Sequence, residues 1–172
     1  MAKTLILIPS RMSATRLPGK PLLKINNLSI VSHVFKRAKE ANIGEVVVAT
    51  EDQEILSDIL NNGGKAILTQ KNHKTGTDRI FEAYKKLNIK NIDYILNLQG
   101  DEPNIDKDDI INLNNLMINS KSEIGTLAAT IRDDKMLNNK NVVKVITESK
   151  LDVNNFPKAL NFTRDNFSIN NK

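Results

Sequence analysis

The chain has 172 residues, no cysteine and a formal charge of +5, which together argue against several classes of protein. Its length and 40% hydrophobic content fit one domain with a sizeable core. Two Tyr, five Phe and no Trp leave little for base stacking, so the basic charge does not predict a nucleic-acid partner. Two histidines without cysteine do not favour a zinc site. Only short apolar runs occur, and the N-terminus lacks a signal-peptide core, so we expect a cytoplasmic protein without membrane contact.

Short apolar runs alternate with amphipathic stretches along the chain. Strands are predicted at 5–8, 45–50, 65–68 and 94–98, with later ones at 125–131, 142–147 and 159–164. Helices are predicted at 29–40, 52–62, 77–87 and 106–119. This alternation predicts an α/β fold, a three-layer α/β/α arrangement around a Rossmann-like, mostly parallel sheet. No repeat or linker divides the chain, so a single domain over 1–172 is expected.

The loop that follows the first predicted strand carries three cations, Arg11, Arg16 and Lys20. In open parallel sheets ligands bind beyond the carboxyl ends of the strands, so these cations are well placed for a polyanion. Small residues between them let backbone amides approach a ligand. The loop is neither a P-loop nor a dinucleotide fingerprint, because Gly19 is its only glycine. The pattern predicts a phosphate site, although an ordinary basic surface loop would carry the same charges.

A second segment, Thr75-Gly76-Thr77-Asp78-Arg79, precedes a helical stripe. Thr77 is predicted to be the N-cap of that helix. The free amides of the first turn would then bring partial positive charge to the carboxyl edge of the sheet. A capped helix without any ligand explains the same residues.

A third segment, Gln99-Gly100-Asp101-Glu102-Pro103, directly follows the strand predicted at 94–98. A carboxylate at the end of a central strand suits Mg²⁺, which prefers oxygen ligands and keeps few protein contacts. Gly100 permits close approach of the backbone. A solvated acidic turn is the alternative.

Together these segments resemble the 3-deoxy-manno-octulosonate (Kdo) cytidylyltransferase family, a branch of the sugar nucleotidyltransferases. Two matches are specific: Ile8-Pro9-Ser10-Arg11 with Thr15-Arg16-Leu17-Pro18-Gly19-Lys20-Pro21-Leu22, and Asn97-Leu98-Gln99-Gly100-Asp101-Glu102-Pro103. Three are weaker: the Thr75–Arg79 segment, Val142-Val143-Lys144-Val145, and Phe162-Thr163-Arg164.

The resemblance implies a sheet of the nucleotide-diphospho-sugar transferase type and a reaction of CTP with Kdo. The products would be CMP-Kdo, for lipopolysaccharide biosynthesis, and pyrophosphate, with Mg²⁺ as cofactor. Arg11, Lys20 and Asp101 would be catalytic, with Asp101 also binding the metal. Gln99 and Arg164 would bind the acceptor sugar. The expected nucleotide-binding residues are Pro9, Ser10, Arg11, Arg16, Lys20, Thr75, Gly76, Thr77, Arg79 and Gln99.

The resemblance also has limits. The family is homodimeric, and its members extend well beyond this length. A later H-x-G-I-Y-x-Y region, which serves the acceptor and the dimer, and a G-x-D-x-P-x-D-L segment with a second metal-binding Asp are not found here. We therefore expect a chain that lacks the family's C-terminal part. A sibling nucleotidyltransferase with another acceptor, and a nucleotide-binding module without catalysis, stay open as alternatives.

Overall fold

The computed structural model describes residues 3–13, 17–152 and 155–165. The chain divides into two compact units, Met1–Glu123 and Ile124–Lys172. The strands of the first unit are β1 (Thr4–Ser10), β2 (Lys24–Ile25), β3 (Leu28–Ser29), β4 (Gly44–Thr50), β5 (Ala66–Leu68) and β6 (Tyr94–Asn97). Its helices are η1 (Lys20–Leu22), α1 (Ile30–Glu40), α2 (Gln53–Asn61), α3 (Gly76–Leu87) and α4 (Lys107–Ser120). The second unit contains α5 (Asp134–Asn138), β7 (Lys144–Thr147) and β8 (Ala159–Thr163).

A parallel four-stranded sheet with the order β5-β4-β1-β6 organises the first unit. β1 is central, because it pairs with β4 over its whole length and with β6 over its first four residues. The side chains of Leu5 to Ile8 are fully buried, as expected for a strand covered on both faces. The Rossmann-like sheet predicted from the alternation of elements is confirmed.

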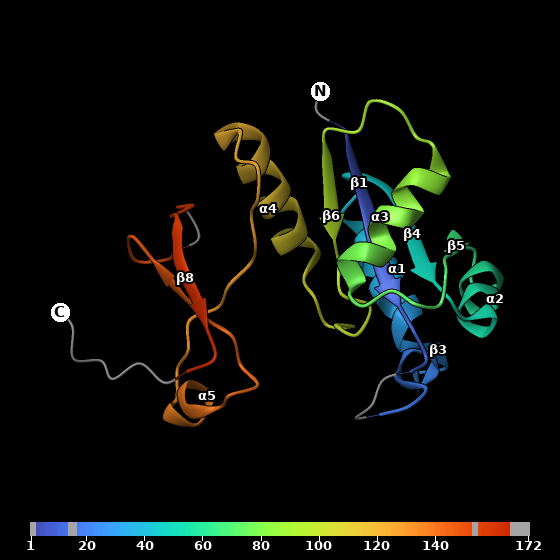
Figure 1. Ribbon diagram of the computed structural model, residues 1–172, viewed down its shortest axis with the longest axis horizontal. Coiled ribbons are helices and arrows are strands. Elements are labelled where there is room, and N and C mark those ends of the chain that lie inside the picture. The colour runs from blue at the N-terminus through green and yellow to red at the C-terminus, as the bar shows by residue number, and fades with distance from the viewer. Residues whose placement is uncertain (1–2, 14–16, 153–154, 166–172) are drawn as a thin grey trace. The chain divides into compact units, whose positions relative to one another are not determined.

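Helices cover both faces of this sheet, so the first unit has the predicted three layers (Figure 1). Successive residues of β1 point to opposite faces, and each face has its own apolar cluster. One cluster joins the sheet to α1, α2 and α4 and includes Ile6, Ile8, Val34, Ile55 and Ile110. The other joins it to α3 and includes Leu5, Leu7, Val47 and Ile80.

Hydroxyl groups fix the start of α1 against α2. Ser29 is the N-cap of α1 and accepts a hydrogen bond from the amide of Ser32. Both serine hydroxyls donate to Asp58 of α2, at 2.5 Å from Ser29 and 2.8 Å from Ser32. This contact joins two helices of the same layer. The short β2–β3 hairpin before α1 was not predicted from the sequence, because it has only two residues in each strand.

The second unit is built on an antiparallel pair of strands, β7 and β8. Lys144 is buried there, and its ammonium group donates to the carbonyl oxygens of Asn139 and Arg164. The strand predicted at 125–131 is wrong: those residues form no strand. Their apolar pattern has no pairing partner among the described residues, and Leu127 is 46% exposed.

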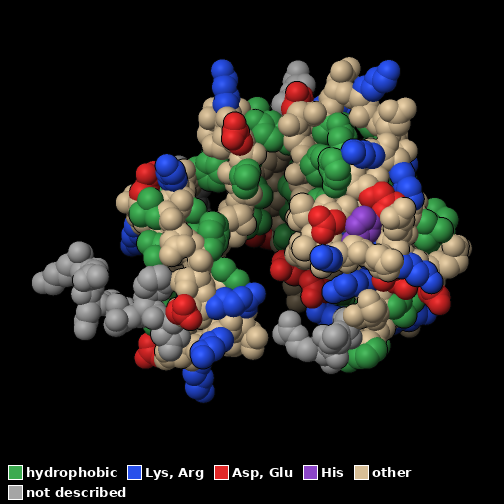
Figure 2. All heavy atoms as spheres, in the orientation of Figure 1, with side chains coloured by type: hydrophobic (Ala, Val, Ile, Leu, Met, Phe, Trp, Pro, Cys, Tyr) green, Lys and Arg blue, Asp and Glu red, His purple; other side chains and the backbone are tan. Residues whose placement is uncertain are grey.

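Charged side chains of both signs are spread over the visible surface of each unit (Figure 2). In the described ranges, no helix is both long and apolar enough to cross a membrane.

Candidate functional site

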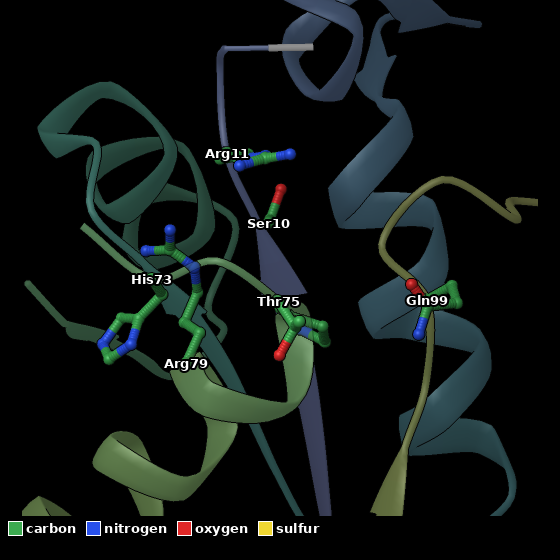
Figure 3. Close-up of a pocket in the computed structure, with 8 residues that line it drawn as sticks. Ser10, Arg11, His73, Thr75, Arg79 and Gln99 are labelled. Carbon is green, nitrogen blue, oxygen red and sulfur yellow. The ribbon is translucent and has the colours of Figure 1, made fainter. Parts of the chain in front are cut away.

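A cavity of about 190 Å³ lies where the predicted phosphate loop leaves β1. Its lining comes from the end of β1, the segment that enters α3, and the residues after β6. Figure 3 shows His73 and Arg79 on one side, Gln99 on the other, and Ser10 and Arg11 at the end of β1. The lining residues are Pro9, Ser10, Arg11, His73, Thr75, Gly76, Arg79 and Gln99. All but His73 were predicted to bind the nucleotide, so segments far apart in sequence meet as expected.

The backbone groups of Met12 make two hydrogen bonds that hold the loop after β1. The amide of Gly19 donates to the carbonyl of Met12 at 3.1 Å, and the amide of Met12 donates to Asp52 Oδ2 at 2.7 Å. Gly19 has φ of 72°, a left-handed conformation that favours glycine and begins the η1 turn. Arg11 is exposed and faces the cavity. Arg16, predicted to bind the nucleotide, lies outside the described residues.

Lys20 and Asp101, two of the predicted catalytic residues, form an ion pair. The ammonium nitrogen of Lys20 lies 2.8 Å from Asp101 Oδ2, with the side chains 33% and 55% exposed. Neither residue lines the cavity, but each follows a segment that does, since Arg11 begins the loop of Lys20 and Gln99 precedes Asp101. The pair brings the loop after β1 into contact with the turn after β6.

Gly100 lets these two segments come together. A Cβ atom at this position would lie 2.9 Å from the carbonyl oxygen of Pro9 and 3.4 Å from the Cβ of Ser10. Any side chain would therefore push the turn after β6 away from the end of β1. The close approach expected of Gly100 is confirmed.

The N-cap of helix α3 lies earlier in the chain than predicted. Thr75, not Thr77, is the N-cap, and its hydroxyl accepts from the amide of Asp78 at 3.1 Å. Asp78 accepts in return from the amide of Thr75, which completes a capping box. The hydrogen bond from the Thr75 hydroxyl lowers the pKa of Asp78. Thr77 is exposed in the first turn and is not among the described residues that line the cavity.

Arg79 is held in place by Glu51 and Thr69, two residues that were not identified from the sequence. Its guanidinium donates to Glu51 Oε2 at 2.5 Å and to the hydroxyl of Thr69 at 2.7 Å. The side chain is only 3% exposed, so the ion pair with Glu51 offsets the cost of burying its charge. This geometry gives Arg79 a supporting role at the wall of the cavity, and its contact with a nucleotide stays a prediction.

His73 belongs to a second polar cluster behind the cavity. Its Nε2 hydrogen-bonds to Glu82 of α3, which also accepts from the amide of Gln70 at 3.0 Å and pairs with Lys86 at 2.6 Å. Burial raises the pKa of Glu82, but the hydrogen bonds from Lys86, His73 and Gln70 outweigh it and lower that pKa to about 2. The spacing of Glu82 and Lys86, four residues apart on a helix, was the only signal of this cluster in the sequence.

The two residues predicted to bind the acceptor sugar belong to different units. Gln99 lines the cavity, and its amide donates to Asn97 Oδ1 at 3.2 Å. Arg164 lies in the second unit, where its guanidinium donates to the carbonyl oxygens of Lys140 and Asn141, each at 3.1 Å. The contact of either residue with an acceptor sugar stays a prediction.

Asp101 is the strand-end carboxylate expected to bind a metal ion. Among the described residues there is no group of three or more His, Asp or Glu side chains suited to a metal. A single half-exposed carboxylate fits Mg²⁺ only if water and a ligand's phosphates complete its oxygen shell.

A model of the cytidylyltransferase family matches residues 5–170 of the chain. The 3-deoxy-manno-octulosonate cytidylyltransferase of Nitrobacter hamburgensis is 48% identical over 84% of this chain and 56% of its own length. A protein of the same name from Rhodopseudomonas palustris is 43% identical over 94% of this chain and 65% of its own. The chain thus spans about three fifths of the length of these curated relatives.

A solved structure of CMP:2-keto-3-deoxy-manno-octonic acid synthetase complexed with CTP is similar to this one, with a TM-score of 0.83 and 37% identity. The match covers 95% of this chain and 64% of that one. The resemblance inferred from the loop after β1 and the turn after β6 is therefore confirmed. With nearly its whole described length matched by the family model, the chain belongs to the cytidylyltransferase family.

Proposed function

We propose that this chain binds CTP and takes part in the activation of Kdo, giving CMP-Kdo and pyrophosphate for lipopolysaccharide biosynthesis. The observation that carries the proposal is the meeting of the cationic loop after β1, the capped start of α3 and the turn after β6 around one cavity. The names of the relatives support the choice of CTP and Kdo. We propose that both compact units belong to one nucleotidyltransferase domain, since the family model spans both. We also propose that the reaction takes place in the cytoplasm.

In the proposed reaction the anomeric hydroxyl oxygen of Kdo attacks the α-phosphorus of CTP. A bond forms between these two atoms, the bond from the α-phosphorus to the bridging oxygen breaks, and pyrophosphate leaves while the hydroxyl proton passes to solvent. Such a displacement needs alignment and neutralisation of charge rather than a protein nucleophile. Arg11 and Lys20 would bind the triphosphate and stabilise the charge of the departing pyrophosphate.

Asp101 would hold Mg²⁺ together with water and the phosphates of the nucleotide. When bound, the ion would neutralise phosphate charge and lower the pKa of the attacking hydroxyl. The ion pair between Lys20 and Asp101 would compete with both roles. Gln99 would orient the acceptor from the side of the cavity opposite Arg79, and Arg164 is proposed as a second contact with that sugar.

The remaining cavity residues would position the nucleotide. The backbone of Pro9, Ser10 and Gly76 offers close approach, and Thr75 keeps the first turn of α3 in place through its capping box. Thr77 in that turn, and Arg16 in the loop after β1, are proposed as further contacts.

A nucleotide-binding module without catalysis is the second candidate, since the cavity alone would explain binding of CTP. Calorimetric titration with CTP and a pyrophosphate-release assay with CTP, Kdo and Mg²⁺ distinguish the two. Binding with release supports the enzyme, and binding without release supports the module. Release with sialic acid or a sugar 1-phosphate, but not with Kdo, would instead indicate a sibling with another acceptor. Absence of CTP binding would refute both the enzyme and the module.

A further inference from the structure

Met12 joins the two ends of the loop after β1. The carbonyl of Met12 accepts from the amide of Gly19 at 3.1 Å, and its side chain packs against the larger apolar cluster. Arg11 directly precedes Met12, and Lys20 directly follows Gly19. The bond between Met12 and Gly19 therefore sets how far apart the backbones of the two predicted phosphate-binding cations lie.

Asp52 holds this junction from outside the loop. Its Oδ2 accepts a hydrogen bond from the amide of Met12 at 2.7 Å. Asp52 stands at the N-cap position of α2, where a carboxylate ordinarily bonds to an amide of its own helix, yet it makes no such capping bond. Its own amide donates to the hydroxyl of Thr50 at 3.1 Å, which fixes Asp52 to the end of β4. The carboxylate thus serves the neighbouring loop instead of its helix.

We propose that Asp52 is a positioning residue, which holds Met12 so that Arg11 and Lys20 are in place for a triphosphate before the ligand arrives. The proposal rests on the proposed function for the identity of the nucleotide, but its argument concerns only the two cations and phosphate. Preorganised charges bind more tightly because less ordering is needed on binding.

The charge of Asp52 works against this benefit. A carboxylate beside a phosphate loop repels phosphate, so any gain comes from its hydrogen bond to Met12. Asp52→Asn keeps an acceptor oxygen and removes the charge, whereas Asp52→Ala removes both. The two variants therefore separate positioning from charge.

Asp58 provides a matched control on the same helix. It also accepts hydrogen bonds from an earlier segment, the hydroxyls of Ser29 and Ser32, and among the described residues it makes no hydrogen bond to the loop. Asp58→Ala should lower the melting temperature and leave phosphate binding unchanged.

The test is calorimetric titration of CTP and, separately, inorganic triphosphate, with a chelator present, into the parent chain and the three variants. We expect Asp52→Ala to bind both probes roughly 10-fold more weakly, the scale for losing a hydrogen bond to a charged group. Asp52→Asn should bind at least as tightly as the parent. If Asp52→Ala loses no more affinity than Asp58→Ala, or if Asp52→Asn is as weak as Asp52→Ala, the proposal is wrong.

The second probe separates this proposal from the proposed function. A parent chain that binds triphosphate but not CTP contradicts the function and still tests Asp52. A parent chain that binds neither probe overturns both. If Asp52→Ala does not fold, a 10-fold loss in the nearly isosteric Asp52→Asn alone refutes the role of the hydrogen bond.

Discussion

Replacing Asp101 with Asn tests the centre of the proposed mechanism. The change keeps the shape of the side chain and removes its charge, so it breaks the ion pair with Lys20 and removes the proposed metal ligand together. These two losses act in opposite directions on CTP binding. Comparing titrations with and without Mg²⁺ therefore resolves them.

The size of the first effect follows from the exposure of the pair. With side chains 33% and 55% exposed, the Lys20–Asp101 contact is screened by solvent, and such pairs contribute about 0.2–1 kcal/mol. The proposed contact of Lys20 with the triphosphate competes with this ion pair, and Asp101→Asn removes the competition. Metal-free binding of CTP should consequently tighten by up to about fivefold in Asp101→Asn.

The second effect appears only with Mg²⁺. The parent chain should bind CTP more tightly when Mg²⁺ is present, because Asp101 and the phosphates share the ion. Asp101→Asn should lose that enhancement. Glu102→Gln, which makes the same change in charge one residue further on, should keep it. A mutant at Asp101 that retains the full Mg²⁺ effect would refute Asp101 as the metal ligand.

Three further outcomes are expected. Lys20→Ala should weaken CTP binding by about 1–3 kcal/mol with little change in melting temperature. Lys24→Ala, in the exposed strand β2, should change neither quantity. Equal CTP affinity in the two variants would remove Lys20 from the site. Ser10→Ala should raise the free energy of unfolding by about 1 kcal/mol, because the Ser10 hydroxyl is buried without a hydrogen-bond partner among the described residues. Ser32→Ala, which loses the bond to the α2 carboxylate, should lower it in the same denaturation series, so equal signs would contradict this reading. The pKa of Glu82 is lowered from 4.5 to about 2, so its charge stabilises the fold above pH 4.5 and this contribution is lost as pH falls towards 2. In acid denaturation, the difference in free energy of unfolding between the parent and Glu82→Gln should therefore shrink over that interval. A constant difference would be inconsistent with the lowered pKa.

Much of the fold and part of the site could be predicted because their signals are local. The apolar run of β1 and the loop after it are adjacent in sequence, as are β6 and the turn at Gly100. In a parallel sheet these strand ends must lie at one edge, so local patterns were enough to bring the lining residues together.

The groups that support the site could not be found in this way. The bonds from Met12 to Asp52 and from Arg79 to Glu51 join residues 40 and 28 positions apart, and their geometry depends on how the strands pack. Thr75 is different, since Thr75 and Asp78 have the spacing of a capping box. That spacing predicts Thr75 as the N-cap, so the prediction of Thr77 was wrong for a reason visible in the sequence.

The central place of β1 has a consequence for motion in the site. β1 is paired on both sides and fully buried from Leu5 to Ile8, so its amides should exchange with solvent only in the largest opening events of the first unit. Arg11 and Gln99, by contrast, are exposed residues beyond the strand ends. The cavity therefore stands at the end of a slowly exchanging strand, and its exposed side chains Arg11 and Gln99 should adjust to a ligand more readily than β1 does.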